Sequence, residues 1–160
     1  MPWGPSFDVP ELTNYSTSGT AITDMNGKAN TEAVLNYATA QTDWRTASAI
    51  TWTDAEGSYP LFECAWRYHT SGTVQGDWFV PAAGQLYYLQ SNSDELAKLN
   101  AGFTAIGAGL FEFQGNTRGT STENGGWQAW FTSSFNLSTM YKYRENYATR
   151  PFCSKLMTRI

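Results

Sequence analysis

The chain of 160 residues has few of the side chains on which catalysis and metal binding depend. It contains one histidine and two cysteines, and only 15% of its residues are charged. His69, Cys64 and Cys153 do not have the spacing of a zinc site. The sequence also lacks a Gly-rich phosphate loop and the context of a Ser-His-Asp triad. We therefore expect a protein that is not an enzyme and that needs no metal or other cofactor.

Long apolar runs are missing as well. No stretch approaches the roughly 20 consecutive apolar residues of a membrane-spanning helix, and the N-terminus has no basic segment followed by an apolar one. The net charge of −4 repels nucleic-acid backbones and anionic lipids. We therefore expect no nucleic-acid partner and no insertion into a membrane.

The length of the chain and its 16% aromatic content favour a single folded domain. Residues 1–6 are rich in proline and glycine, which is typical of a linker. We assign residues 1–29 to an N-terminal linker or strand extension, with further domains upstream in the native chain. Residues 30–160 are assigned to the domain.

The two cysteines allow two interpretations. Cys64 and Cys153 pair with each other if the protein is exported, or they stay free and buried. Buried thiols are favoured. For His69 a structural role is favoured.

Apolar spacing predicts four helices, at residues 30–41, 61–69, 81–89 and 93–106. Asn30 is the expected N-cap of the first helix, and Val34, Leu35 and Ala38 form its apolar face.

Short strands are expected at residues 76–81, 110–113 and 128–132, separated by loops rich in Gly, Ser, Asn and Thr. Helices that precede strands in this way indicate an α+β fold.

The C-terminal third, residues 119–153, is crowded with Tyr, Trp, Asn, Ser and Gly but has little aliphatic periodicity. Rigid aromatic side chains give contact area at a low entropy cost, and small polar residues adapt their hydrogen bonds around them, as in antibody loops. This composition indicates a binding surface.

Four motifs, in order, resemble those of bacterial and phage domains with the C-type-lectin fold, which include relatives of formylglycine-generating enzyme and the variable proteins of diversity-generating retroelements. They are GDWFVPAAGQL at 76–86, TSTE at 120–123, AW at 129–130 and ATRPF at 148–152. Residues 43–50 and 64–73 resemble the versions found in gut Bacteroidales and their phages. The likeness covers about residues 30–156, with Gln85 and Thr149 standing where the family usually has Glu and Val.

The resemblance implies two main helices packed beside a twisted antiparallel sheet, long C-terminal loops, and N- and C-terminal strands that lie close together. It also implies a non-enzymatic recognition module with a hypervariable aromatic and polar surface, displayed on a phage or bacterial surface. The implied partner is a protein or glycan receptor on another cell. In relatives diversified by retroelements, the segment between the second and the last motif forms the binding face.

In this chain that segment contains the residues that we expect to bind the ligand. Trp127, Tyr141 and Tyr143 lie in loop-like sequence and are expected to be exposed. The full set is Asn124, Trp127, Gln128, Phe131, Ser133, Tyr141, Tyr143, Arg144, Glu145 and Asn146.

Other residues of the motifs are expected to be structural. Trp78, Trp130 and Phe152 lie in motif strands and are expected in the core. Arg150 is expected to make a fixed internal hydrogen bond.

Two alternative functions stay open. The chain is typical also of a structural component of a virion or pilus tip. A calcium-dependent carbohydrate-binding lectin is disfavoured, because calcium takes roughly six to eight oxygen ligands. Only Glu123 and Asn124 offer such oxygens in the candidate loop.

Overall fold

The computed structural model describes residues 1–41, 57–105, 107, 109–113, 117–134, 136–144 and 150–153. The helices are α1 (Ser18–Ala21), α2 (Gly27–Gln41), α3 (Pro60–Arg67), α4 (Ala83–Ser91) and α5 (Ser93–Ala105). The strands are β1 (Trp78–Phe79), β2 (Thr117–Asn124), β3 (Gln128–Ser133), β4 (Asn136–Tyr141) and β5 (Phe152–Cys153). The expected α+β class is confirmed.

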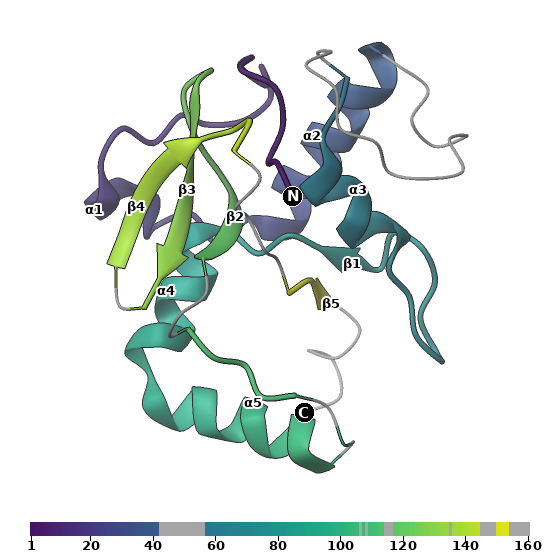
Figure 1. Ribbon diagram of the computed structural model, residues 1–160, viewed down its shortest axis with the longest axis vertical. Coiled ribbons are helices and arrows are strands. Elements are labelled where there is room, and N and C mark those ends of the chain that lie inside the picture. Colours follow the sequence, from purple (N-terminus) through teal and green to yellow (C-terminus); the bar gives the residue numbers. More distant parts are fainter. Residues whose placement is uncertain are drawn as a thin grey trace.

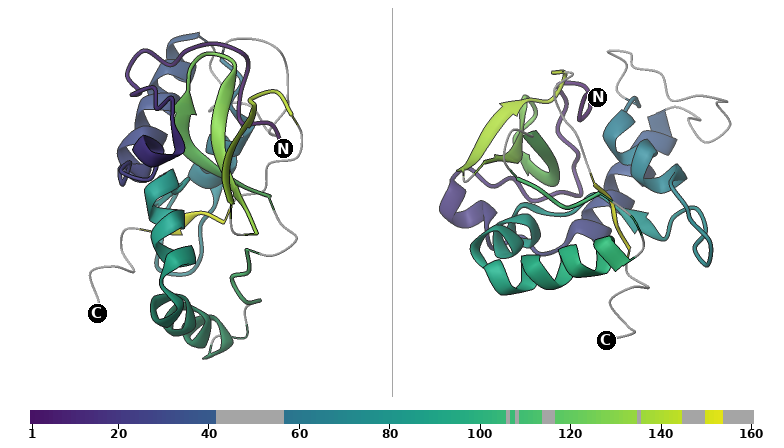
Figure 2. Two further views of the ribbon diagram at one scale, coloured as in Figure 1. Left: turned by 90° about the vertical axis from the view of Figure 1, so that its left-hand side faces the viewer. Right: turned by 60° about the horizontal axis from the view of Figure 1, so that its bottom comes forward.

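The sheet β2-β3-β4 is antiparallel and lies on one side of the molecule, with α2 and α3 on the other side (Figure 1). The N-terminal segment runs between these two parts, as the views in Figures 1 and 2 agree. Strands β1 and β5 form a separate two-stranded antiparallel sheet. The C-terminal strand therefore pairs with β1 and not with the N-terminal segment.

Helix α2 begins at Gly27 and not at Asn30, and the Asn26 carbonyl accepts the Asn30 backbone N–H at 2.8 Å in its first turn. The carboxylate of Asp24 accepts a hydrogen bond from the Asn26 backbone N–H at 3.0 Å. Asn30 lies inside the helix and donates from Nδ2 to the same carboxylate at 2.8 Å. The predicted apolar face is confirmed, since Val34, Leu35 and Ala38 are buried.

The next helices differ from prediction mainly at their ends. Helix α3 stops at Arg67, and His69 is exposed beyond it. Helix α4 begins at Ala83, two residues after the proline that we expected in its first turn. Gln85 Oε1 accepts a hydrogen bond from the Ala82 N–H at 2.9 Å, so the glutamine caps α4 as a glutamate would.

Helix α5 begins at Ser93, as predicted, and its partly buried face covers a cluster formed by Leu86, Phe111 and Phe113. Residues 110–113 were expected to form a strand, and this is wrong. The side-chain amide of Asn100 accepts from the Phe111 N–H at 2.7 Å and donates to the Phe111 carbonyl at 3.2 Å. A side chain thus satisfies the backbone groups that a neighbouring strand would otherwise bind.

The N-terminal segment is part of the core and not a linker. We call residues 3–9 the N-terminal arm. Trp3 is 0% exposed, and its ring meets those of Tyr59 and Phe62 edge-on at 5.9 and 4.7 Å. Val9 at the other end of the arm is buried in the same cluster. The boundary that we placed at residue 29 therefore does not separate a linker from the domain.

Of the three motif aromatics expected in the core, one is buried and two are half-buried. Trp130 is 5% exposed and donates from Nε1 to the Tyr15 carbonyl at 2.7 Å. Phe152 is half-buried against the cluster under α5. Trp78 is also only half-buried, because it packs edge-on against the exposed ring of Tyr68 at 4.8 Å.

Both cysteines are free thiols, as favoured from the sequence. Cys153 is buried, whereas Cys64 is half-buried and burial raises the pKa of its thiol. Arg150 donates to the carbonyls of Leu110 and Gly109 at 2.8 and 2.7 Å, which confirms its internal role. Thr149 lies outside the described residues. Within the described part of the chain, no helix has the length and apolar character needed to cross a bilayer.

These positions predict which substitutions the fold tolerates. Replacing Trp130 with Ala should lower the free energy of unfolding by about 3–5 kcal/mol, through lost burial and a cavity. Replacing Tyr141, which is 43% exposed, should change it by no more than about 0.5 kcal/mol. Urea denaturation measures both, and equal losses would contradict the division between core and surface.

Candidate functional site

A tight turn brings several of the predicted ligand-binding residues to one end of the sheet. Gly125 to Trp127 connect β2 to β3, and Gly125 has φ 75°, a left-handed conformation that favours glycine. Asn14 Oδ1 accepts a hydrogen bond from the Gly125 N–H at 2.6 Å and holds the turn against the N-terminal segment. The side chain of Trp127 is 67% exposed, as predicted.

The strand register places three more residues in one row at this end. Asn124 lies opposite Gln128, and Gln128 lies opposite Tyr141. Residues opposite one another in antiparallel strands have side chains on the same face of the sheet. The amide of Asn124 donates to Gln128 Oε1 at 3.3 Å, which joins the row.

Two exposed tyrosines extend this surface beyond the end of β4. The rings of Tyr141 and Tyr143 stack with centroids 5.5 Å apart and planes 20° apart. The guanidinium of Arg144 lies over the Tyr143 ring at 5.9 Å. Trp127 adjoins them through the backbone, since its carbonyl accepts from the Lys142 N–H at 3.1 Å. We call Trp127, Tyr141, Tyr143 and Arg144 the aromatic patch.

Phe131 and Ser133 lie apart from the aromatic patch. Phe131 packs against the main hydrophobic cluster. Ser133 lies at the opposite end of β3, paired with Thr117 and Asn136, about 17 Å along the strand from Gln128. Glu145 and Asn146 lie outside the described residues.

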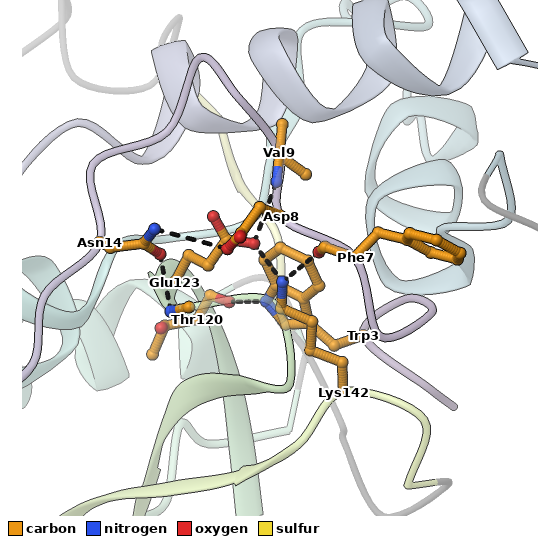
Figure 3. A network of polar contacts seen from close by, with 9 residues as sticks. Trp3, Phe7, Asp8, Val9, Asn14, Thr120, Glu123 and Lys142 are labelled. Atoms are coloured by element: carbon orange, nitrogen blue, oxygen red, sulfur yellow. Dashed lines mark hydrogen bonds and ion pairs between the residues drawn. The ribbon is translucent and has the colours of Figure 1, made fainter.

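A buried ion pair lies beneath the aromatic patch. The Lys142 side chain lies between Tyr141 and Tyr143 in sequence, is 0% exposed, and binds Glu123 Oε1 through Nζ. Nζ also donates to the Phe7 carbonyl at 2.7 Å and lies 4.7 Å from the centre of the Trp3 ring. Figure 3 shows this network, with Asp8 beside Glu123.

The N-terminal arm makes further hydrogen bonds in this network. The Lys142 carbonyl accepts hydrogen bonds from the Trp3 and Gly4 N–H groups at 2.8 and 3.3 Å. Trp3 Nε1 donates to the Thr120 carbonyl at 2.7 Å, and Glu123 Oε1 accepts from the Val9 N–H at 3.3 Å (Figure 3). The arm thus connects the end of β4 to strand β2.

Burial and mutual attraction act in opposite directions on the two charges. Burial raises the pKa of Glu123 and lowers that of Lys142, because each charged form loses its hydration. The attraction between the two groups opposes both shifts. Glu123 Oε2 is buried without a hydrogen-bond partner in the described part of the chain. Each charge of the pair therefore depends on the other.

The pair is suited to support a surface and not to react with a substrate. A general acid or base must come within hydrogen-bonding distance of the group that it protonates or deprotonates. Lys142 and Glu123 are both 0% exposed in their side chains and bind each other. Among the described residues, no three His, Cys, Asp or Glu side chains are grouped to hold a metal ion.

The predictions from sequence did not include Lys142, Trp3 or Phe7 in the site, and placed Glu123 in the TSTE motif and among possible calcium ligands. No local pattern in the sequence indicates this pair. Strand β4 ends at Tyr141, and Lys142 and Tyr143 lie in the turn that follows, where the alternation of side chains along a strand does not apply. A buried lysine needs an acid as its partner, and here that partner comes from another strand.

Comparisons of the chain with protein-family models, with curated proteins and with solved structures found no match. The resemblance to domains with the C-type-lectin fold therefore stays a prediction from motifs. The observations that bear on function are the geometry of the aromatic patch and of the ion pair beneath it.

The ion pair predicts a dependence of stability on both partners. Replacing Lys142 with Met should lower the free energy of unfolding by about 3–5 kcal/mol, because Glu123 keeps a buried charge with no opposite charge beside it. The double replacement Lys142→Met and Glu123→Gln should restore most of this loss, since neither side chain is then charged. Urea denaturation at neutral pH measures each variant, and a double variant no more stable than the single one would contradict this account.

The same single variant should respond to pH. Without Lys142, burial holds the folded-state pKa of Glu123 above its unfolded value, so the folded protein binds the extra proton. The stability lost at neutral pH should therefore return as pH falls through that raised pKa. Melting temperatures of Lys142→Met between pH 7 and pH 5 test this, relative to the wild type at each pH. A gap that stays constant with pH would show that charge is not its cause.

Calcium should have no effect on the fold. Lys142 already neutralises Glu123, and one carboxylate with the Asn124 side-chain oxygen falls far short of the roughly six to eight oxygens that calcium takes. Chelator should leave the melting temperature unchanged, and millimolar calcium should not raise it. A rise of several degrees would instead support the lectin alternative.

Proposed function

We propose that this protein is a non-enzymatic recognition module with the C-type-lectin fold, displayed on a phage or bacterial surface. Its aromatic patch binds a protein or glycan receptor on another cell. The observation that carries the proposal is the exposure of large aromatic side chains at one end of a sheet whose underside is fixed by a buried ion pair.

The composition of the patch supports binding. Trp, Tyr and Arg are the residue types most enriched at the hot spots of protein interfaces. Trp127, Tyr141 and Tyr143 are 67%, 43% and 41% exposed, so their apolar rings meet solvent in the unbound protein. Burying those rings against a partner would release the water that covers them, which favours association.

The side chains of the aromatic patch are ordered in the unbound protein, which also favours binding. Binding costs less when the contacting side chains are ordered before the partner arrives. Tyr141 and Tyr143 are already stacked, and Arg144 already lies over Tyr143. The row of Asn124 and Gln128 beside them offers polar groups that can adapt to a ligand.

The motif resemblance supplies the setting of the proposal. In the retroelement-diversified relatives that the motifs resemble, the corresponding segment varies while the scaffold strands stay fixed. Asn, Ser, Tyr, Gly and Phe, all found here between residues 124 and 147, are among the residues reached by substituting adenines in an Asn codon. Sibling sequences that differ mainly in this segment would support a hypervariable surface.

A cell-binding titration tests the proposal. Fluorescently labelled protein is titrated onto intact cells of a panel of gut Bacteroidales strains and onto an array of immobilised glycans. Replacing Trp127, Tyr141, Tyr143 and Arg144 together with Ala should abolish the binding that the wild type shows. Among the single variants, one or two should each cost roughly 2 kcal/mol or more of binding free energy, and the replacement of Asn124 or Gln128 should cost less.

The matched control removes two other exposed tyrosines. Tyr87 and Tyr88 on α4 are 40% and 52% exposed, and their joint replacement with Ala should leave binding unchanged. Binding that survives the loss of all four patch residues, in a protein of unchanged melting temperature, would place the site elsewhere.

A further inference from the structure

We infer that Lys142 is the positioning residue of the aromatic patch, and that the N-terminal arm is part of the recognition site although it presents none of the patch side chains. This inference rests on the proposed function, because it concerns how the patch gets its shape. It assigns to the arm a role in recognition and not only in the core.

Lys142 lies between two residues of the aromatic patch in the sequence. Tyr141 and Tyr143 are its two neighbours, so anchoring the Lys142 side chain limits the movement of the backbone that carries both tyrosines. Lys142 has three anchors for its side chain: Glu123 from β2, the Phe7 carbonyl and the ring of Trp3. Two of these three anchors belong to the N-terminal arm.

The backbone of Lys142 also contacts the parts of the chain that carry the aromatic patch. Its N–H donates to the Trp127 carbonyl at 3.1 Å, and its carbonyl accepts from Trp3 and Gly4 at 2.8 and 3.3 Å. One residue thus joins the β2–β3 turn that carries Trp127 to the end of β4 that carries Tyr141. Movement of the arm would disturb all of these contacts together.

Positioning of the aromatic patch can be distinguished from stabilisation of the whole fold. A neutral pair of similar size can replace a buried ion pair at little cost in stability, but it does not hold its partners by charge. The four-carbon stem of Lys142 would then be replaced by a flexible Met side chain with no hydrogen bonds to Glu123 or Phe7. The fold would be kept, and the directions of Tyr141 at the end of β4 and of Tyr143 in the turn after it would be less strictly set.

Fluorine NMR of protein carrying 3-fluorotyrosine tests this without any ligand. The Tyr141 signal is identified as the one missing from Tyr141→Phe. In the wild-type background, Tyr143→Leu should move that signal, because the stacked ring that shields it is removed. In the Lys142→Met, Glu123→Gln background, the same Tyr143→Leu change should no longer move it.

The chain offers a matched control for the removal of a Lys–Glu pair. Lys98 and Glu95 form an ion pair of 2.8 Å on the exposed side of α5. In a Lys98→Met, Glu95→Gln background, Tyr143→Leu should move the Tyr141 signal as it does in the wild type. If the coupling also persists in the folded Lys142→Met, Glu123→Gln protein, Lys142 supports only the fold, and the inference is wrong.

Hydrogen exchange of the wild-type protein gives a second test, which decides the matter if the double variant does not fold. If the arm and the end of β4 form one unit, the amides of Trp3, Gly4 and Lys142 should exchange through one opening event with the same protection. Rapid exchange at Trp3 and Gly4 beside a protected Lys142 would overturn the inference. Both tests are independent of cell binding, so failure of the proposed function and failure of this inference give different results.

Discussion

The fold depends on satisfying four consecutive polar residues that it buries in β2. Thr120 to Glu123 are each no more than 1% exposed, and a buried polar group without a partner costs free energy. Their partners come from distant parts of the chain. Thr120 binds the Trp130 carbonyl, Ser121 binds Asn30, Thr122 binds Asp24, and Glu123 binds Lys142. Each of these hydrogen bonds fixes another element against β2.

This requirement explains how a small, weakly charged domain can hold an exposed aromatic surface. Asp24 is bound by Thr122 at 2.7 Å and by the Asn30 amide of α2 at 2.8 Å, so the strand and the helix share one carboxylate. Glu123 at the other end of the run fixes Lys142, and hence the turn after β4. Strand β2 therefore fixes the elements that bind its buried polar residues, and the aromatic patch lies near the end of this strand.

The sequence predicted local features better than the distant hydrogen bonds. Helix α5 and strand β3 were found from periodicity, and the exposure of Trp127, Tyr141 and Tyr143 was found from composition. The start of α2, the non-strand at 110–113 and the burial of the arm were missed. The last two misses involve a side chain that binds backbone groups at least 11 residues away in sequence, and neither periodicity nor spacing reports such a partner. Trp3 is 117 residues from the Thr120 carbonyl that it binds.

Exposed and buried side chains alternate residue by residue where β4 ends and the following turn begins, so scaffold and recognition surface are interleaved there. Tyr141 and Tyr143 face solvent, whereas Lys142 between them is buried with Glu123. An outward side chain at the end of a strand has few neighbours, so its replacement changes the surface without opening a cavity. Replacement of the inward lysine would leave a buried carboxylate alone. If this segment is diversified, variation should therefore concentrate at positions 141 and 143 and spare 142, a pattern set by the exposure of the two tyrosines and by the cost of an unpaired buried charge.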